Sequence, residues 1–300
     1  MSKTMNLALI VVLLAPAVLT GQSNEQQGWW FSERFQGTSN AAGVVLKENS
    51  TLGYAFNSHI QAYGGLPVYF TRESADYTAS GNPRFINGIG NAFTGFLISA
   101  SNDLLKYSSD VVVTAPTGDR ARGFSTGHVT ADWTNTFSHA FSGVTPYGSA
   151  GLANTISDTA FFVRPFTTQG VVLHFEGGAL FRIANHLNAG ASAYDVHAAG
   201  SQEIVSKIVE VPASQTSPST TSGKNSTVTK AVGLNGNVNK AIFETTHQTV
   251  TTADVADDHG FSTWLSLRPN STTDFQIGYS HSVAYQLNSL FFGVGFRSGH

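Results

Sequence analysis

Residues 123–133, GFSTGHVTADW, bring a serine and a histidine close together, at Ser125 and His128. A serine hydroxyl activated by an imidazole is the nucleophile of many hydrolases, and the imidazole in turn needs a group that orients it. The sequence ties no acid or amide to these two residues, and serine is frequent throughout the chain. A lipid hydrolase acting at the membrane rim is therefore the weakest of the functional alternatives.

Metal and cofactor chemistry find little support in the residue spacing. The chain has 10 histidines, but no two of them stand four residues apart as zinc-binding helices require. Cysteine is absent, which excludes disulfides, thiolate ligands and a cysteine nucleophile. The stretch GIGNAFTG at 88–95 lacks the third glycine of a dinucleotide-binding loop. We therefore expect no cofactor, no metal site and no enzymatic activity.

Charged side chains recur on one face of segments with alternating hydrophobicity. In GVVLHFEGGALFRI, residues 170–183, the apolar Val171, Leu173 and Phe175 alternate with His174 and Glu176. Successive side chains of a strand point to opposite faces, so each such segment has an apolar face and a polar face. The polar face carries eight candidate lumen-lining residues: Arg34, Lys106, Asp110, Asp132, His174, Glu176, Arg182 and Asp274.

These eight residues allow two interpretations because both signs of charge occur among them. In a narrow barrel such charges pair across the interior and fill it, whereas in a wider barrel they line a path for solutes. Trp30 and Trp264 fall on the same inward face. In the second interpretation their rings offer a surface to apolar solutes.

The elements that would position these side chains are long alternating strands joined by turns. Segments of about ten alternating residues are the pattern of a transmembrane β-barrel. Twelve candidate strands lie near 29–38, 42–56, 59–71, 85–100, 104–116, 126–140, 144–155, 170–184, 187–207, 258–269, 273–284 and 287–297. The sequence therefore predicts an all-β fold, an antiparallel up-and-down transmembrane barrel of about twelve strands.

The connections support this fold because short and long ones alternate. Short turns are followed by longer Gly/Ser/Asp-rich loops near 72–84, 117–125, 156–169 and 208–257, and only the link 39–41 is short where a long loop is expected. In outer-membrane barrels the long loops are extracellular. The polar stretch 208–257 is expected to be a long extracellular loop or hairpin, with 239–252 as part of a hairpin rising from the rim.

The composition also indicates that part of the protein surface faces something other than water. Charged residues make up 12% of the chain, about half of the usual share of roughly 25%. The mean hydropathy is only −0.04, because Ser, Thr, Asn and Gly supply the polarity. A soluble β-sandwich would have shorter strands and a more charged exterior. The formal net charge of −3 indicates no nucleic-acid partner.

The N-terminus has the features of a signal peptide. Lys3 precedes the apolar run 7–19, LALIVVLLAPAVL, which is shorter than the roughly 20 residues of a transmembrane helix. We expect a cleaved signal peptide at 1–21 and a barrel over 22–300, exported to a bacterial outer membrane; the alternative is an N-terminal membrane anchor. The expected partners are outer-membrane lipid and the barrel-assembly machinery.

Four stretches carry a resemblance to a known family: VVVTAPTGDRARGFSTGHVTADWTNTFSHAF (111–141), TPYGSAGLANT (145–155), HFEGGALFRIANHLNAGASAYDV (174–196) and HGFSTWLSLRPNSTTDFQIGYSHSVAYQLNSLFFGVGF (259–296). The chain resembles the outer-membrane proteins of the MetA-pathway of phenol degradation, which are related in outline to FadL-like, porin-like barrels. The resemblance implies a barrel that passes aromatic or other hydrophobic small molecules. It supplies no agreed binding residues, so none are transferred.

The last segment, NSLFFGVGFRSGH at 288–300, fits a closing strand of a barrel. Alternation assigns to the lipid-facing side Leu290, Phe292, Val294 and Phe296, and to the lumen Ser289, Gly293 and Gly295, with Phe291 as a bulky exception. The predicted function is a passive channel or uptake porin for small hydrophobic or aromatic compounds, constricted by its loops. The main alternative is a closed structural barrel that presents 208–257 to a partner.

Overall fold

The computed structural model describes residues 27–40, 43–73, 85–119, 124–125, 127–155, 168–206, 247–251, 257–284 and 286–298. The expected signal peptide at 1–21 and most of the stretch 208–257 lie outside the described residues. No helix in the described part of the chain is long and apolar enough to cross a membrane.

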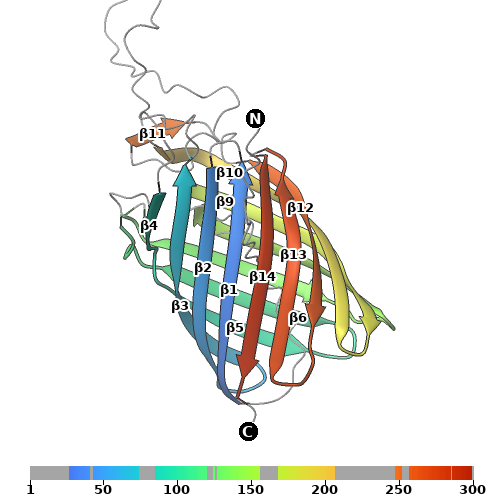
Figure 1. The fold of residues 1–300 in the computed structure, drawn as a ribbon. Coiled ribbons are helices and arrows are strands. Elements are labelled where there is room, and N and C mark those ends of the chain that lie inside the picture. The colour runs from blue at the N-terminus through green and yellow to red at the C-terminus, as the bar shows by residue number, and fades with distance from the viewer. Residues whose placement is uncertain are drawn as a thin grey trace, which may run out of the picture.

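Fourteen strands make up the described structure: β1 (Gly28–Asn40), β2 (Gly43–Ala55), β3 (Ile60–Glu73), β4 (Phe85–Ile89), β5 (Phe93–Ser101), β6 (Lys106–Thr114), β7 (Thr130–Ser138), β8 (Val144–Thr155), β9 (Thr168–Ala184), β10 (Leu187–Ser206), β11 (His247–Thr251), β12 (Asp258–Leu267), β13 (Thr273–Ser282) and β14 (Leu287–Arg297). Twelve of them close into one antiparallel barrel in the order β1-β2-β3-β5-β6-β7-β8-β9-β10-β12-β13-β14, with β14 paired to β1 (Figure 1). The predicted twelve-strand barrel is confirmed.

One end of the barrel carries short turns, and asparagine side chains hold three of them. The Asn57 Oδ1 atom accepts hydrogen bonds from the backbone N–H groups of His59 and Ile60, at 2.8 and 3.0 Å. Asn102 holds the turn between β5 and β6 in the same way, and Asn270 the turn between β12 and β13. An asparagine that accepts from the backbone two residues ahead forms a stable local turn. These turns fix which strands become neighbours.

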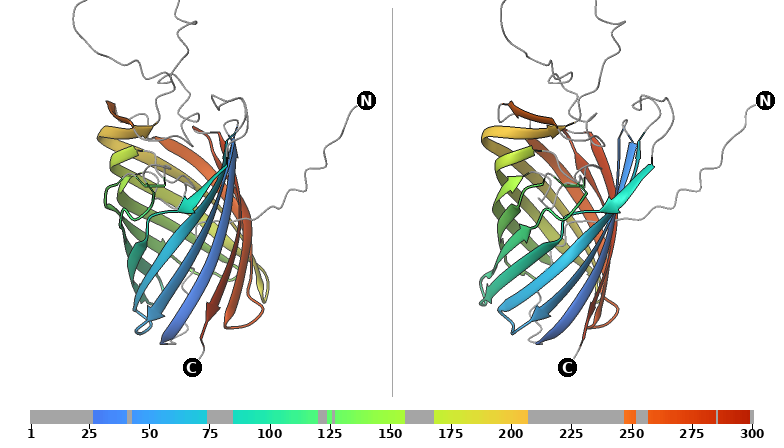
Figure 2. Two further views of the ribbon diagram at one scale, coloured as in Figure 1. Left: turned by 60° about the vertical axis from the view of Figure 1, so that its left-hand side comes forward. Right: turned by 90° about the vertical axis from the view of Figure 1, so that its left-hand side faces the viewer.

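The wall is interrupted where a single strand was expected over 85–100. The structure instead has two strands, β4 and β5, which pair with the upper and lower parts of β3 (Figure 2). The cause is Pro67 in β3, which has no N–H to donate across the sheet. Three residues, 90–92, therefore stand opposite two, and the ladder continues only through the bond from Gly90 N to Pro67 O, at 2.8 Å. The result is a bulge.

β11 lies beyond the barrel wall. It pairs with Gln202–Ser206 of β10, whereas β12 pairs with the lower part of the same strand, Leu187–Val196. β11 covers residues 247–251 of the hairpin expected over 239–252, whereas residues 239–246 and 252 lie outside the described residues, so the hairpin stays a prediction.

The two faces of the wall differ as alternation predicts. On β14 the side chain of Phe291 is 0% exposed, whereas its neighbour Leu290 is 40% exposed. Inside the barrel Phe291 packs with Tyr147 and Trp264, and Leu180 lies against this cluster. The exterior face carries most of the exposed large hydrophobic side chains.

Candidate functional site

The interior face carries three tyrosine–carboxylate pairs. The hydroxyl of Tyr63 donates to Asp110 at 2.7 Å, and that of Tyr147 donates to Glu176 at 2.8 Å. In the third pair, Tyr194 on β10 donates to Asp258 on β12 at 2.9 Å. Hydrogen bonds to a carboxylate are roughly twice as strong as those between neutral groups. Each pair therefore holds an interior acid in a fixed position on the wall.

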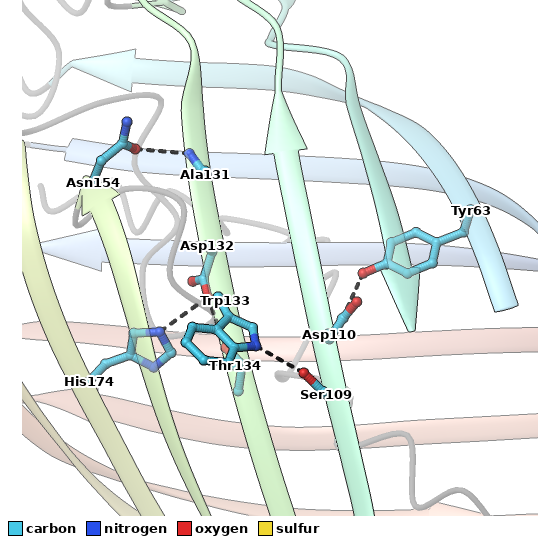
Figure 3. A network of polar contacts seen from close by, with 9 residues as sticks. All are labelled: Tyr63, Ser109, Asp110, Ala131, Asp132, Trp133, Thr134, Asn154 and His174. Atoms are coloured by element: carbon cyan, nitrogen blue, oxygen red, sulfur yellow. Dashed lines mark hydrogen bonds and ion pairs between the residues drawn. The ribbon is translucent and has the colours of Figure 1, made fainter. Parts of the chain in front are cut away.

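A histidine–aspartate pair lies near two of these acids, because Asp110 interacts electrostatically with Asp132 and Glu176 with His174. His174 Nε2 lies 3.2 Å from the Oδ1 atom of Asp132, and both side chains are buried. The Thr134 hydroxyl also donates to Asp132, at 2.8 Å. Figure 3 shows His174 and Asp132 beside the Tyr63–Asp110 pair, so that β3, β6, β7 and β9 all contribute to one polar lining.

Arg34 lies apart from this network. It is on β1, whereas the residues of the network are on β3, β6, β7 and β9. Within the described residues Arg34 makes no hydrogen bond and no ion pair. Asn49 is paired with Arg34 across the β1–β2 ladder but accepts no hydrogen bond from its guanidinium. The Asn49 Oδ1 atom has no hydrogen-bond partner among the described residues.

The remaining predicted lining residues lie toward the short-turn end. Lys106 is the first residue of β6, and Arg182 is close to the end of β9. Asp274, at the start of β13, accepts from the Ser266 hydroxyl at 3.4 Å and interacts electrostatically with Arg268 and Arg297. The structure thus brings Asp110, Asp132, His174 and Glu176 together and keeps Arg34, Lys106, Arg182 and Asp274 outside that network. Whether these eight residues contact a solute stays a prediction.

Interior aromatic rings lie flat over glycines of neighbouring strands. A Cβ atom added to Gly53 would lie 2.3 Å from the Trp30 ring, and one added to Gly190 would lie 2.1 Å from the Trp264 ring. Tyr63 covers Gly95 and Phe291 covers Gly278 in the same manner. Aromatic cover of strand glycines stabilises a sheet. Here it also holds these four rings against the wall.

At the long-loop end a side chain from the β6–β7 connection packs against the interior wall. Phe124 is 1% exposed and stacks on Tyr69, with ring centroids 5.6 Å apart and an interplanar angle of 13°. The same ring covers Gly88 of β4. Tyr69 also contacts the Lys47 ammonium group, which lies 5.7 Å from the centre of the Tyr69 ring. Phe124 therefore occupies interior space near this mouth.

The hydrolase alternative gains nothing from this connection. Ser125 is 0% exposed, and its hydroxyl accepts a hydrogen bond from the backbone N–H of Gly127 at 3.0 Å. A lipid ester does not reach a hydroxyl buried in this way. Among the described residues no group of three or more His, Asp or Glu side chains is arranged to hold a metal ion.

Two parts of the polar structure were not predicted. Asp258 is 1% exposed inside the barrel, and its place as the first residue of β12 hid it from the alternation pattern. Glu33 and Glu48 lie on the exterior face, where the Ser50 hydroxyl lies 2.7 and 2.6 Å from their carboxylates. Their positions alternate with inward ones along β1 and β2, so the period-two pattern does contain this signal.

Replacing Asp258 by alanine should destabilise the barrel. The Tyr194 hydroxyl and the backbone N–H of Ala284 both donate to this carboxylate, at 2.9 Å each. Each buried donor left without an acceptor costs about 1–3 kcal/mol. Urea unfolding of the refolded protein in lipid vesicles measures the loss. Asp258→Asn keeps an acceptor oxygen and should lose clearly less; equal losses for both variants would contradict this role.

The comparisons with known proteins agree with the fold. No protein-family model matches the sequence, and no curated protein matches it. Among solved structures, the COG4313 outer membrane channel from Pseudomonas putida F1 is similar, with a TM-score of 0.54 and 8% identity over 91% of this chain and 97% of that chain. A NanC porin (TM-score 0.49, 9% identity, 89% and 100% covered) and a TodX deltaS2S3 mutant monoaromatic hydrocarbon channel (0.44, 7%, 95% and 93%) are less similar. At these identities the likeness shows the fold alone, and the two lower scores carry no argument.

Proposed function

We propose that this chain is a bacterial outer-membrane channel that lets small solutes, including aromatic and other hydrophobic compounds, diffuse through its lumen. The observation that carries the proposal is the closed barrel with a polar and aromatic interior face and an apolar exterior face. An apolar exterior belongs in lipid, because a closed barrel leaves no backbone group unpaired there. The similar solved structure with a TM-score of 0.54 is itself an outer membrane channel.

The proposal is supported by several described interior rings that lie against the wall. Trp30, Tyr63 and Trp264 lie against glycines of the wall, and the ring centroids of Trp30 and Tyr63 are 5.8 Å apart. The partly exposed rings of Trp30 and Tyr63 can receive planar solutes that are partly apolar. Phe124 anchors the β6–β7 connection to the wall at the long-loop mouth, and this connection is the constriction that would set the size limit.

Reconstitution into liposomes and planar bilayers tests the proposal. The purified protein should give discrete conductance steps and should let arabinose swell the vesicles. Protein that is folded, as shown by a gel shift on heating, yet gives neither conductance nor swelling would reject a channel. The alternative, a structural barrel with a partner-binding loop at 208–257, predicts that result together with partner binding that is lost when the loop is removed.

A further inference from the structure

We propose that the seam between β1 and β14 holds an anion site in which Arg34 binds the carboxylate of a small solute that also has a flat apolar part, such as an aromatic acid. The inference rests on the proposed channel function and narrows its substrate class. It depends on three observations: a cation without a partner, open space beside it, and interior acids that already have donors.

Arg34 has a charge that nothing in the described structure offsets. A guanidinium stays protonated at any physiological pH. It has five N–H donors, and among the described residues none of them meets an acceptor. The side chain is only partly exposed, on the interior face. A charge taken partly out of water without a counter-ion is costly, and an anion that reaches it gains a charge-assisted, two-pronged contact.

The acids of the interior do not offset the charge of Arg34, because they already accept hydrogen bonds from other side chains. Asp110, Glu176 and Asp258 each accept from a tyrosine hydroxyl, at 2.7–2.9 Å. Asp132 has both His174 and Thr134. Arg34 is therefore an interior donor whose charge no acid among the described residues offsets. Its complement is an anion.

Open space lies directly beside Arg34 because β14 has glycines there. Gly293 is the position paired with Arg34, and Gly295 is paired with Ser32. A Cβ atom added to Gly293 would meet only the Cβ atom of Gln276, at 3.9 Å, and one added to Gly295 only the Cβ atom of Asp274, at 4.0 Å. These glycines differ from those beneath the aromatic rings, where the added atom would overlap a side chain. They form the bare floor of an alcove.

The rim of the alcove matches a carboxylate with an apolar body. Gln276 lies opposite Gly293 on β13 and brings a second N–H donor near the Arg34 end. Trp30 lies four positions away along the same face of β1, about 13 Å at roughly 3.3 Å per residue, and its ring covers Gly53 of β2 on the opposite side from β14. An aromatic acid can place its carboxylate at Arg34 and its flat ring on the bare glycine floor.

Block of single-channel current by benzoate tests this site, with benzyl alcohol as the uncharged analogue of similar shape. Wild-type channels in KCl should be blocked by benzoate at lower concentration than by benzyl alcohol. Arg34→Gln should raise the benzoate concentration for half block about tenfold, as expected for the loss of one charged contact. Gly293→Leu fills the alcove while it keeps Arg34, and it should weaken the block to a similar extent.

Lys106→Gln is the matched control, because it removes the same charge from the interior face outside the alcove. It should leave benzoate block unchanged. Equal effects of Arg34→Gln and Lys106→Gln, or equal block by benzoate and benzyl alcohol in the wild type, would overturn the site. A wild type that conducts but shows no benzoate block overturns the site alone, whereas a folded wild type without conductance rejects the channel itself.

Discussion

Replacing Gly190 by alanine is expected to cost the barrel several kcal/mol of stability and to lower its conductance. The new Cβ atom would lie 2.1 Å from Cε2 and 2.3 Å from Cζ2 of Trp264, an indole that is 5% exposed. Overpacking of a well-filled interior costs about 1–3 kcal/mol, and more when a rigid ring has no free space to move into. Displaced from the wall, the ring enters the interior. Urea unfolding followed by tryptophan fluorescence and single-channel recording measure the two effects.

Gly177→Ala is the matched control for this substitution. Gly177 is a strand residue on the neighbouring β9, and an added Cβ atom there would meet nothing within 4 Å. Stability and conductance should stay at the wild-type values. If both alanine variants lose stability equally, strand propensity and not aromatic cover explains the glycines, and the interior rings do not need them.

Replacing Phe124 by alanine should raise the conductance, on the order of twofold, because a constriction dominates the resistance of a pore. Its ring is buried between Tyr69 and Gly88 near the long-loop mouth, so its removal both frees space and detaches the connection from the wall. Single-channel current in KCl measures the change. Vesicles that contain the variant should also swell in sugars that are too large to pass the wild-type channel.

Phe85→Ala provides the control at the same end of the barrel. Phe85 is 74% exposed and stands on β4, where it meets the Arg72 guanidinium. Its removal should not change the conductance. A rise of equal size in both variants would indicate a general loosening of β4 and would remove Phe124 from the role of anchoring the constriction.

Alternation predicted the strands well because each wall residue has one of two very different surroundings. On β9, Leu173 and Phe175 are exposed on the exterior while His174 between them is buried. A single period-two pattern records both faces, so strand limits and strand number follow from the sequence. The split into β4 and β5 did not follow, although Pro67 carries the cause in its missing N–H group.

Contacts across the interior were beyond prediction because they depend on how strands are staggered. Tyr63 on β3 meets Asp110 on β6, with β5 between them, and His174 on β9 meets Asp132 on β7 across β8. The sequence places these residues on the inward face but not at the same height. The lack of a partner for Arg34 is likewise a property of the closed wall and not of β1 alone.

The seam that holds the alcove joins the first and the last of the described strands, which lie far apart in the sequence. Thr38 and Ser289 share a hydrogen bond of 2.9 Å across 251 residues, and the Ser298 hydroxyl donates to the carbonyl of Trp29 across 269. Pairings so distant in sequence are the slowest to form. β14 also follows every other described strand in the sequence, so the Arg34–Gly293 neighbourhood exists only once the ring of strands is closed. Benzoate affinity would therefore report completion of assembly, and an intermediate whose last strand is still unpaired would have none.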